Sequence, residues 1–128
     1  MKLLPVLDGV PAEPKVMRLA ELLAHQPGAV VSRQVLKHPS GSVTVFAFAA
    51  GEGLSEHTAP FDALVQLLEG TARITIGGRP YELAAGDAIV MPAHRPHALA
   101  ALTPFKMVLT MLRPGEQAPP AAATPAPP

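Results

Sequence analysis

Two histidines, His57 and His97, stand in segments that could bring their imidazole rings together. Residues 51–57 read Gly-Glu-Gly-Leu-Ser-Glu-His, and residues 86–97 read Gly-Asp-Ala-Ile-Val-Met-Pro-Ala-His-Arg-Pro-His. Glycine marks the turn of the first segment, glycine and proline mark the turns of the second, and the short runs between them are typical of strands. Neutral imidazole is the commonest metal ligand among side chains, so two converging rings indicate a metal site or a polar pair in a ligand pocket.

The first segment belongs to a longer frame that begins at Gly51 and closes at Gly70. Five residues separate Gly51 from His57, and small side chains follow at Ala59 and Ala63. Because neighbouring side chains of a strand point to opposite faces, Glu56 is expected to face away from the site that His57 faces.

The second segment has a similar frame of glycine, proline and histidine. Five residues separate Gly86 from Pro92, four separate Pro92 from His97, and His94 and Ala101 lie at intermediate and closing positions. Together the two frames resemble the two motifs of the cupin superfamily. The resemblance covers residues 29–112, and it is strongest to small single-domain bacterial conserved-barrel proteins (cupin type 2), many of which have no assigned function.

The resemblance implies a metal site that this chain keeps only in part. The family's ligands are two histidines and a glutamate of the first motif and one histidine of the second. Only His57 and His97 match, because Ala59 stands at the second histidine position and Ala63 at the glutamate position. The second motif also departs from the family, with His94 at a glycine position. The implied cofactor is a divalent transition metal, Fe, Mn, Ni or Zn.

Two protein ligands are few, because catalytic metal sites usually offer three and leave one position open. His94, three residues before His97, is the candidate third ligand, and Asp62 is a weaker one. Gln66 is expected to face away from the site by strand parity. A metal-free pocket in which His57 and His97 are hydrogen-bonded is the alternative interpretation.

Apolar residues around the two histidines indicate a pocket. The two alanines at ligand positions predict a roomier and more apolar cavity than the family's, suited to a small aromatic or largely apolar molecule with one polar group. The predicted lining consists of Phe46, Phe48, Ala59, Phe61, Ala63, Met91 and Leu99.

The strand pattern predicts an all-β fold, an antiparallel sandwich or barrel of the cupin type with a short N-terminal helix. Helical spacing of apolar residues places the helix at residues 13–24, after an arm at residues 1–12. Residues 61–69 are apolar on both faces and are interpreted as a covered central strand, and Gly77–Gly78 suits a two-residue hairpin. The nine predicted strands are residues 29–37, 42–50, 54–58, 61–69, 71–76, 79–84, 87–91, 96–102 and 105–112.

Composition limits the classes of function. The 128 residues carry ten basic and ten acidic side chains, so no basic surface points to a nucleic acid partner. Cysteine is absent, and no apolar stretch approaches the ~20 residues of a membrane span, so we expect a cytoplasmic protein without membrane contact. The predicted domains are residues 1–28 (arm and helix), 29–113 (barrel) and 114–128 (a disordered tail rich in proline and alanine).

Three functions remain open from the sequence. The first is a small-molecule-binding cupin barrel with a partly degenerate metal site between His57 and His97. The second is a metal-dependent enzyme of the dioxygenase or isomerase type acting on a small organic substrate. The third is an interaction module that uses the tail as a tether. A homodimer is expected, because the apolar strand at residues 29–37 is an edge that needs cover.

Overall fold

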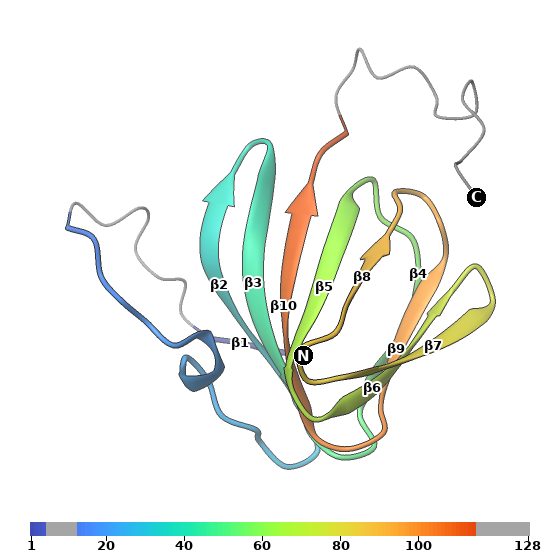
Figure 1. Ribbon diagram of the computed structural model, residues 1–128, viewed down its shortest axis with the longest axis horizontal. Helices are drawn as coiled ribbons and strands as arrows, with labels where there is room; N and C mark the ends of the chain where they lie inside the picture. The colour runs from blue at the N-terminus through green and yellow to red at the C-terminus, as the bar shows by residue number, and fades with distance from the viewer. Residues whose placement is uncertain (5–12, 115–128) are drawn as a thin grey trace.

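The computed structural model describes residues 1–4 and 13–114 as a sandwich of two β-sheets (Figure 1). A single turn of 3-10 helix, η1 (Leu19–Glu21), precedes the main run of strands. The strands are β1 (Lys2–Leu3), β2 (Val30–His38), β3 (Gly41–Phe48), β4 (Gly53–His57), β5 (Asp62–Glu69), β6 (Thr71–Ile76), β7 (Arg79–Ala84), β8 (Ala88–Met91), β9 (His97–Ala101) and β10 (Phe105–Leu112). The all-β class is confirmed, and the nine predicted strands appear within two residues of their predicted bounds.

The two sheets have different sizes. One has six strands in the order β1-β2-β3-β10-β5-β8, and the other has four in the order β4-β9-β6-β7. All pairings are antiparallel except that of β1 with β2. In Figure 1 the strands of both sheets lie close together at the lower end and diverge toward the upper end.

Alternation of side chains explains how the strands bury one face. In β6, Ala72, Ile74 and Ile76 are buried whereas Arg73 is exposed, as the period of two predicts. The turn from β6 to β7 is the two-residue hairpin that the sequence predicts. Both of its residues have positive φ, at 57° and 81°, a conformation that glycine adopts without steric cost.

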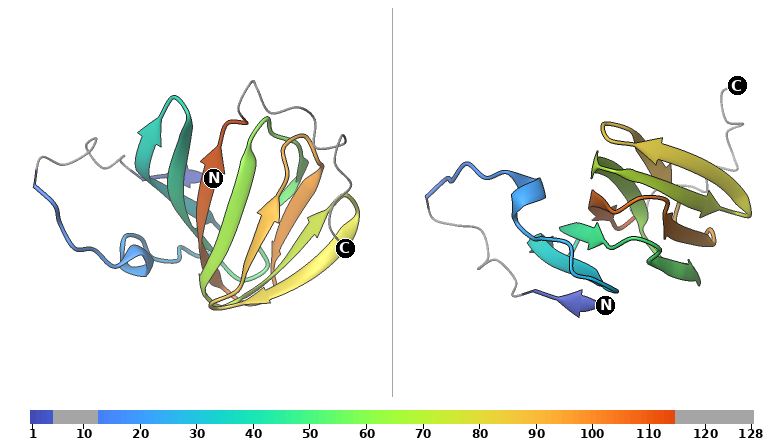
Figure 2. Two further views of the ribbon diagram at one scale, coloured as in Figure 1. Left: turned by 45° about the horizontal axis from the view of Figure 1, so that its top comes forward. Right: turned by 90° about the horizontal axis from the view of Figure 1, so that it is seen from below.

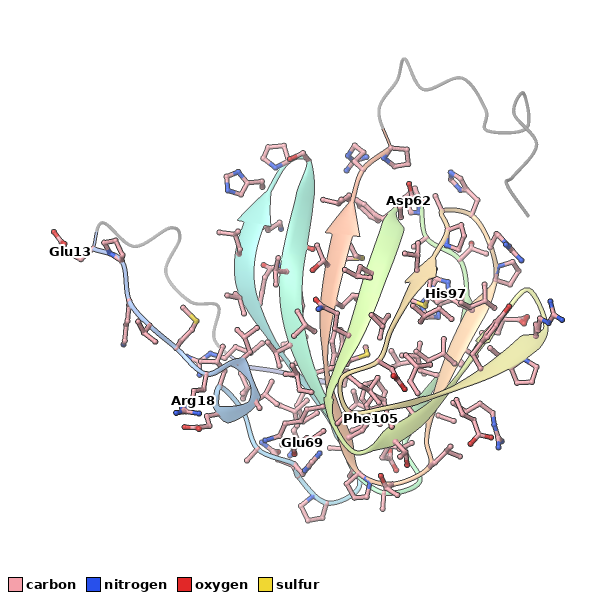
Figure 3. All side chains as sticks on the ribbon, viewed as in Figure 1. Glu13, Arg18, Asp62, Glu69, His97 and Phe105 are labelled. Carbon is pink, nitrogen blue, oxygen red and sulfur yellow. The ribbon has the colours of Figure 1, made fainter. Side chains whose placement is uncertain are left out.

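The lower end of the interior is packed with aromatic and branched side chains. Phe48 of β3 and Phe105 of β10 stack with their ring centroids 4.3 Å apart, and neither ring is exposed. Val65 and Ile74, which lie farther along the interior beside Leu109 and Leu99, are equally inaccessible. Figure 3 shows Phe105 near this end and His97 closer to the other. A stacked aromatic pair contributes about 0.5–1.5 kcal/mol beyond the burial of its area, so this end is the stable part of the fold.

The predicted N-terminal helix is wrong in extent, because residues 13–24 contain only the 3-10 turn Leu19–Glu21. The segment lies against the outer face of the six-stranded sheet (Figure 2). Sheet side chains take up carbonyl groups that a helix would use: Lys106 Nζ donates to the Ala20 oxygen at 2.7 Å, and Arg33 donates to the Leu22 oxygen at 3.0 Å. Short helices have little stability of their own, so these contacts decide the conformation.

Two further expectations about the sheet need correction. β5 is central, but its outer face is covered only near its end, where Leu68 packs against the N-terminal segment; Leu64 is 36% exposed and Gln66 is exposed. Gln66 does face away from the interior, as strand parity predicts. The arm predicted at residues 1–12 begins with a strand instead, since β1 pairs with Val31 and Ser32 of β2.

Other predictions fall partly outside the described residues. Residues 5–12 of the predicted arm and residues 115–128 of the predicted tail lie outside them. Within the described part of the chain, no helix is long and apolar enough to span a membrane.

Candidate functional site

His57 and His97 are direct neighbours on adjacent antiparallel strands. His57 ends β4, His97 begins β9, and the two residues pair in the ladder. Directly opposed side chains of an antiparallel pair lie on the same face. Their Nε2 atoms are 3.1 Å apart and their rings meet edge to face, with centroids 4.3 Å apart. The structure thus brings together two residues that are forty positions apart in the sequence.

Backbone carbonyl groups fix the orientation and the tautomer of both rings. Nδ1 of His57 lies 2.8 Å from the Ser55 oxygen, and Nδ1 of His97 lies 3.0 Å from the Arg95 oxygen. A carbonyl oxygen only accepts, so each Nδ1 carries the hydrogen and donates it. In a neutral imidazole of this tautomer, Nε2 has a free lone pair. Two hydrogen-bond acceptors therefore meet across 3.1 Å.

This arrangement has a place for one hydrogen-bond donor or one metal ion. Two lone pairs at this distance repel each other unless a proton or a metal ion lies between them, whereas two protonated rings would place like charges together. Burial lowers the pKa of His97 from its ordinary value of 6.5; the hydrogen bond to the Arg95 carbonyl opposes this effect, and the neighbouring His57 adds to it. His97 is 7% exposed and His57 is exposed, so the pair is open to solvent from the His57 side.

An irregularity in β4 turns His57 toward the interior. Leu54 pairs with Leu99 and His57 with His97, so three residues of β4 span two of β9. Such a β-bulge lets residues three apart point to the same face, which strict alternation forbids. Leu54 and His57 consequently line the same hollow, and alternation alone could not predict Leu54.

The hollow lies between the sheets at their upper, separated end and has a volume of about 60 Å³. Six of the seven predicted pocket residues line it; Phe48 does not, because it belongs to the aromatic stack at the other end. Leu54, Leu109 and Met111 also line it, although they are not among the predicted residues. The full lining is Phe46, Leu54, His57, Ala59, Phe61, Ala63, Met91, His97, Leu99, Met107, Leu109 and Met111.

The two weaker ligand candidates have other roles. His94 does not line the hollow; it is exposed, has φ of 65°, and its backbone N–H donates to the Ala59 oxygen. Positive φ favours glycine, the residue that the resembling motif places here. The Asp62 carboxylate accepts a hydrogen bond from the Ala93 N–H at 2.8 Å. Both residues hold the loop before β9 against the β4–β5 connection.

Methionines flank the position where the resemblance implies a glutamate ligand. Ala63 of β5 pairs with Met111 of β10 on one side and with Met91 of β8 on the other. All three side chains line the hollow, and Met91 is 3% exposed. The space around the methyl group of Ala63 is thus bounded by two long thioether side chains.

The histidine pair suits two neighbouring positions around a metal ion. Nitrogen ligands lie about 2.0–2.1 Å from zinc, so two atoms 3.1 Å apart can both bind one ion. No group of three or more His, Cys, Asp or Glu side chains occurs among the described residues. The hollow has no carboxylate among its lining residues, so the ligand set does not match Mn, which favours oxygen ligands.

Comparison with known proteins identifies the family. The family described as "Cupin domain" matches residues 44–113. A conserved protein of unknown function from Streptococcus pyogenes is 36% identical over 80% of this chain and 90% of its own, with a TM-score of 0.76. The chain belongs to the cupin superfamily, in agreement with the resemblance found in the sequence.

Two further solved structures support this assignment. A cupin superfamily protein from Desulfitobacterium hafniense is 30% identical, over 80% of this chain and 94% of its own, with a TM-score of 0.75. A cupin 2 conserved barrel domain protein from Leptotrichia buccalis is 36% identical, over 76% of this chain and 47% of its own, with a TM-score of 0.74. Comparison with curated proteins gave no match.

Proposed function

We propose that the protein binds a small molecule in the hollow and that the His57–His97 pair is the polar anchor. The observation that carries this proposal is the pair of free Nε2 acceptors, 3.1 Å apart, in an otherwise apolar lining. Because both nitrogens accept, the matching group on the ligand is a hydrogen-bond donor, such as a hydroxyl or an azole N–H. The rest of the ligand is apolar, like the walls.

The size of the hollow limits the ligand. A volume of about 60 Å³ is well below the roughly 300–1,000 Å³ of common ligand pockets, so only a few heavy atoms enter it. A ring-sized molecule would place its donor group at the histidines and would need more space than the hollow offers in this conformation. Methionine walls, which adapt their shape easily, allow some expansion around such a ligand.

A matched pair of ligands tests this proposal. Phenol and benzene have similar size, but only phenol has a hydroxyl donor, so we expect phenol to bind more tightly and to shift the imidazole NMR signals of both histidines. His57→Ala and His97→Ala should remove this preference, whereas His94→Ala, outside the hollow, should keep it. Equal binding of both molecules, or phenol binding unchanged in both site variants, would contradict the proposal.

A metal-dependent enzyme of the dioxygenase or isomerase type is the second candidate function. The fixed tautomers favour it, because both Nε2 atoms are available as ligands for a transition metal that imidazole suits, such as Fe, Ni or Zn. A bound metal would supply Lewis-acid polarisation of a substrate oxygen. Metal analysis of protein purified without chelator tests this: stoichiometric metal that is lost in His57→Ala supports the enzyme. Metal-free protein that folds normally favours the binding protein.

Self-association and a cytoplasmic location stay predictions. Strand β2 was expected to be a free edge, but β1 covers Val31 and Ser32, and the ladder with β3 shifts register between Gln34 and Leu36. Less open edge is therefore left for a partner than the sequence indicated. Measurement of the molar mass in solution tests the dimer, and a strict monomer would overturn it.

A further inference from the structure

We propose that the hollow is a soft-metal site that selects monovalent copper, Cu(I), with His57, His97 and a methionine thioether as its ligands. The inference rests on the proposed anchoring role of the histidine pair. It goes further than the divalent metal that the resemblance implies, because it assigns monovalent copper and a thioether as the third ligand type.

The methionines carry this inference through their position. Met111, Ala63 and Met91 are successive cross-strand neighbours on β10, β5 and β8, and all three line the hollow with the two imidazoles. Directly opposed residues have Cβ atoms about 4.5–5.5 Å apart, so either thioether can reach across Ala63. Alanine thus occupies the position where the resembling motif has a carboxylate, and a thioether side chain lies on each side of it.

The chemistry of this ligand set is soft. Thioether and imidazole ligands suit Cu(I), whereas carboxylate and water suit Mn and other hard cations. The chain has no cysteine, and three of its five methionines line this one hollow. Methionine is therefore the soft ligand available at the site.

The surroundings also favour an ion of low charge. Apart from the histidines, every lining residue is apolar, and Met91 and Met107 are 3% and 1% exposed. Burying a charge in such surroundings is costly, and the cost is smaller for one charge than for two. Both Nδ1 atoms are already held by carbonyl groups, so the Nε2 lone pairs are oriented before the ion binds.

Anaerobic titration with Cu(I) against a competing colorimetric chelator tests the proposal. We expect one Cu(I) per chain, with tighter binding than Zn(II), and a sulfur neighbour of copper in X-ray absorption spectra. Loss of an outer-shell partner costs roughly 10–100-fold in metal affinity, so the double variant Met91→Leu, Met111→Leu should lose at least as much. It should also lose the sulfur signal.

Controls separate a ligand from a packing residue. Leucine replaces methionine with little change in volume, typically at a cost below about 1.5 kcal/mol, so the double variant should fold, as circular dichroism can show. Met17→Leu changes an exposed methionine outside the hollow and should leave Cu(I) affinity unchanged. Each single variant shows which of Met91 and Met111 binds.

The outcomes distinguish the copper site from the histidine anchor on which it rests. The methionine assignment would be overturned if the double variant bound Cu(I) as tightly as the wild type and neither protein showed a sulfur neighbour of copper. If His57→Ala still lost Cu(I) binding in that case, the histidine anchor would stand. Preference for Zn(II) over Cu(I) would also overturn the methionine assignment. If neither copper nor phenol binding depends on the histidines, both proposals fail.

Discussion

The two ends of the interior are built from the same strands but differ in what fills them. At the lower end Phe48 and Phe105 stack without solvent contact, whereas at the upper end alanine and histidine leave a hollow of about 60 Å³. β10 takes part in both, with Phe105 at one end and Met111 at the other. The fold therefore concentrates its stability at one end, and the other end holds the imidazoles in a fixed but open arrangement.

Removing an aromatic ring from the closed end should have the largest effect on stability. Phe105→Ala deletes a fully buried ring and its stacking partner's contact, so we expect a loss of about 3–5 kcal/mol in the free energy of unfolding. Urea denaturation measures it. At the open end, Phe61→Ala should lower the free energy of unfolding by less, because Phe61 is already partly exposed. An equal loss would contradict the difference in packing between the two ends.

Glycine positions provide a second contrast. Gly70 and Gly86 have φ of 81° and 94°, but a Cβ at Gly70 would meet the Pro104 carbonyl oxygen and Phe105, whereas one at Gly86 meets nothing within 4 Å. Both alanine variants are strained by positive φ, at about 1 kcal/mol or more. Gly70→Ala adds steric overlap at the closed end, for a total of about 2–4 kcal/mol.

The difference between the two alanine variants is the quantity of interest, because it removes the shared backbone strain. Thermal unfolding of both proteins under one condition measures it. Similar melting temperatures would show that the backbone around Gly70 shifts to accommodate the added Cβ. That result would contradict the close packing of this end.

Acid should weaken the fold through the open end. The pKa of His97 is lowered, chiefly by burial, so the unfolded chain binds a proton more readily than the folded one. The stability from neutral His97 is complete above the unfolded value near 6.5 and is lost as the pH falls through the folded pKa. Melting temperatures of chelator-treated protein should fall below this pH, and His97→Gln should flatten the decline; the same slope in both would contradict this cause.

A substitution at the loop before β9 should have the smallest effect. His94 has φ of 65°, where glycine is favoured, so His94→Gly should raise the free energy of unfolding by about 1 kcal/mol or less. Phenol and metal binding should not change, because His94 lies outside the hollow. Weaker binding in this variant would return His94 to the set of ligands.

The sequence predicts the sandwich and the convergence of the histidines because both depend on local periodicity and on motif spacing. It does not predict the short N-terminal helix correctly, because side chains of Lys106 and Arg33 capture its carbonyl groups from distant strands. Leu54 escapes prediction because a bulge breaks alternation in β4. Phe48 was misplaced because alternation gives the face of a strand but not the height of a residue along the interior.

The proposed anchor requires His57 and His97 to present two free Nε2 atoms, 3.1 Å apart, to one ligand group. Long-range ¹H–¹⁵N correlation spectra of protein labelled with ¹⁵N-histidine test it directly, because they distinguish the tautomers of each ring. At a pH well above 7, we predict that both rings carry hydrogen on Nδ1 only, and that one equivalent of metal or phenol shifts both Nε2 resonances together. Hydrogen on Nε2 of either ring, or independent responses of the two rings, would contradict the account.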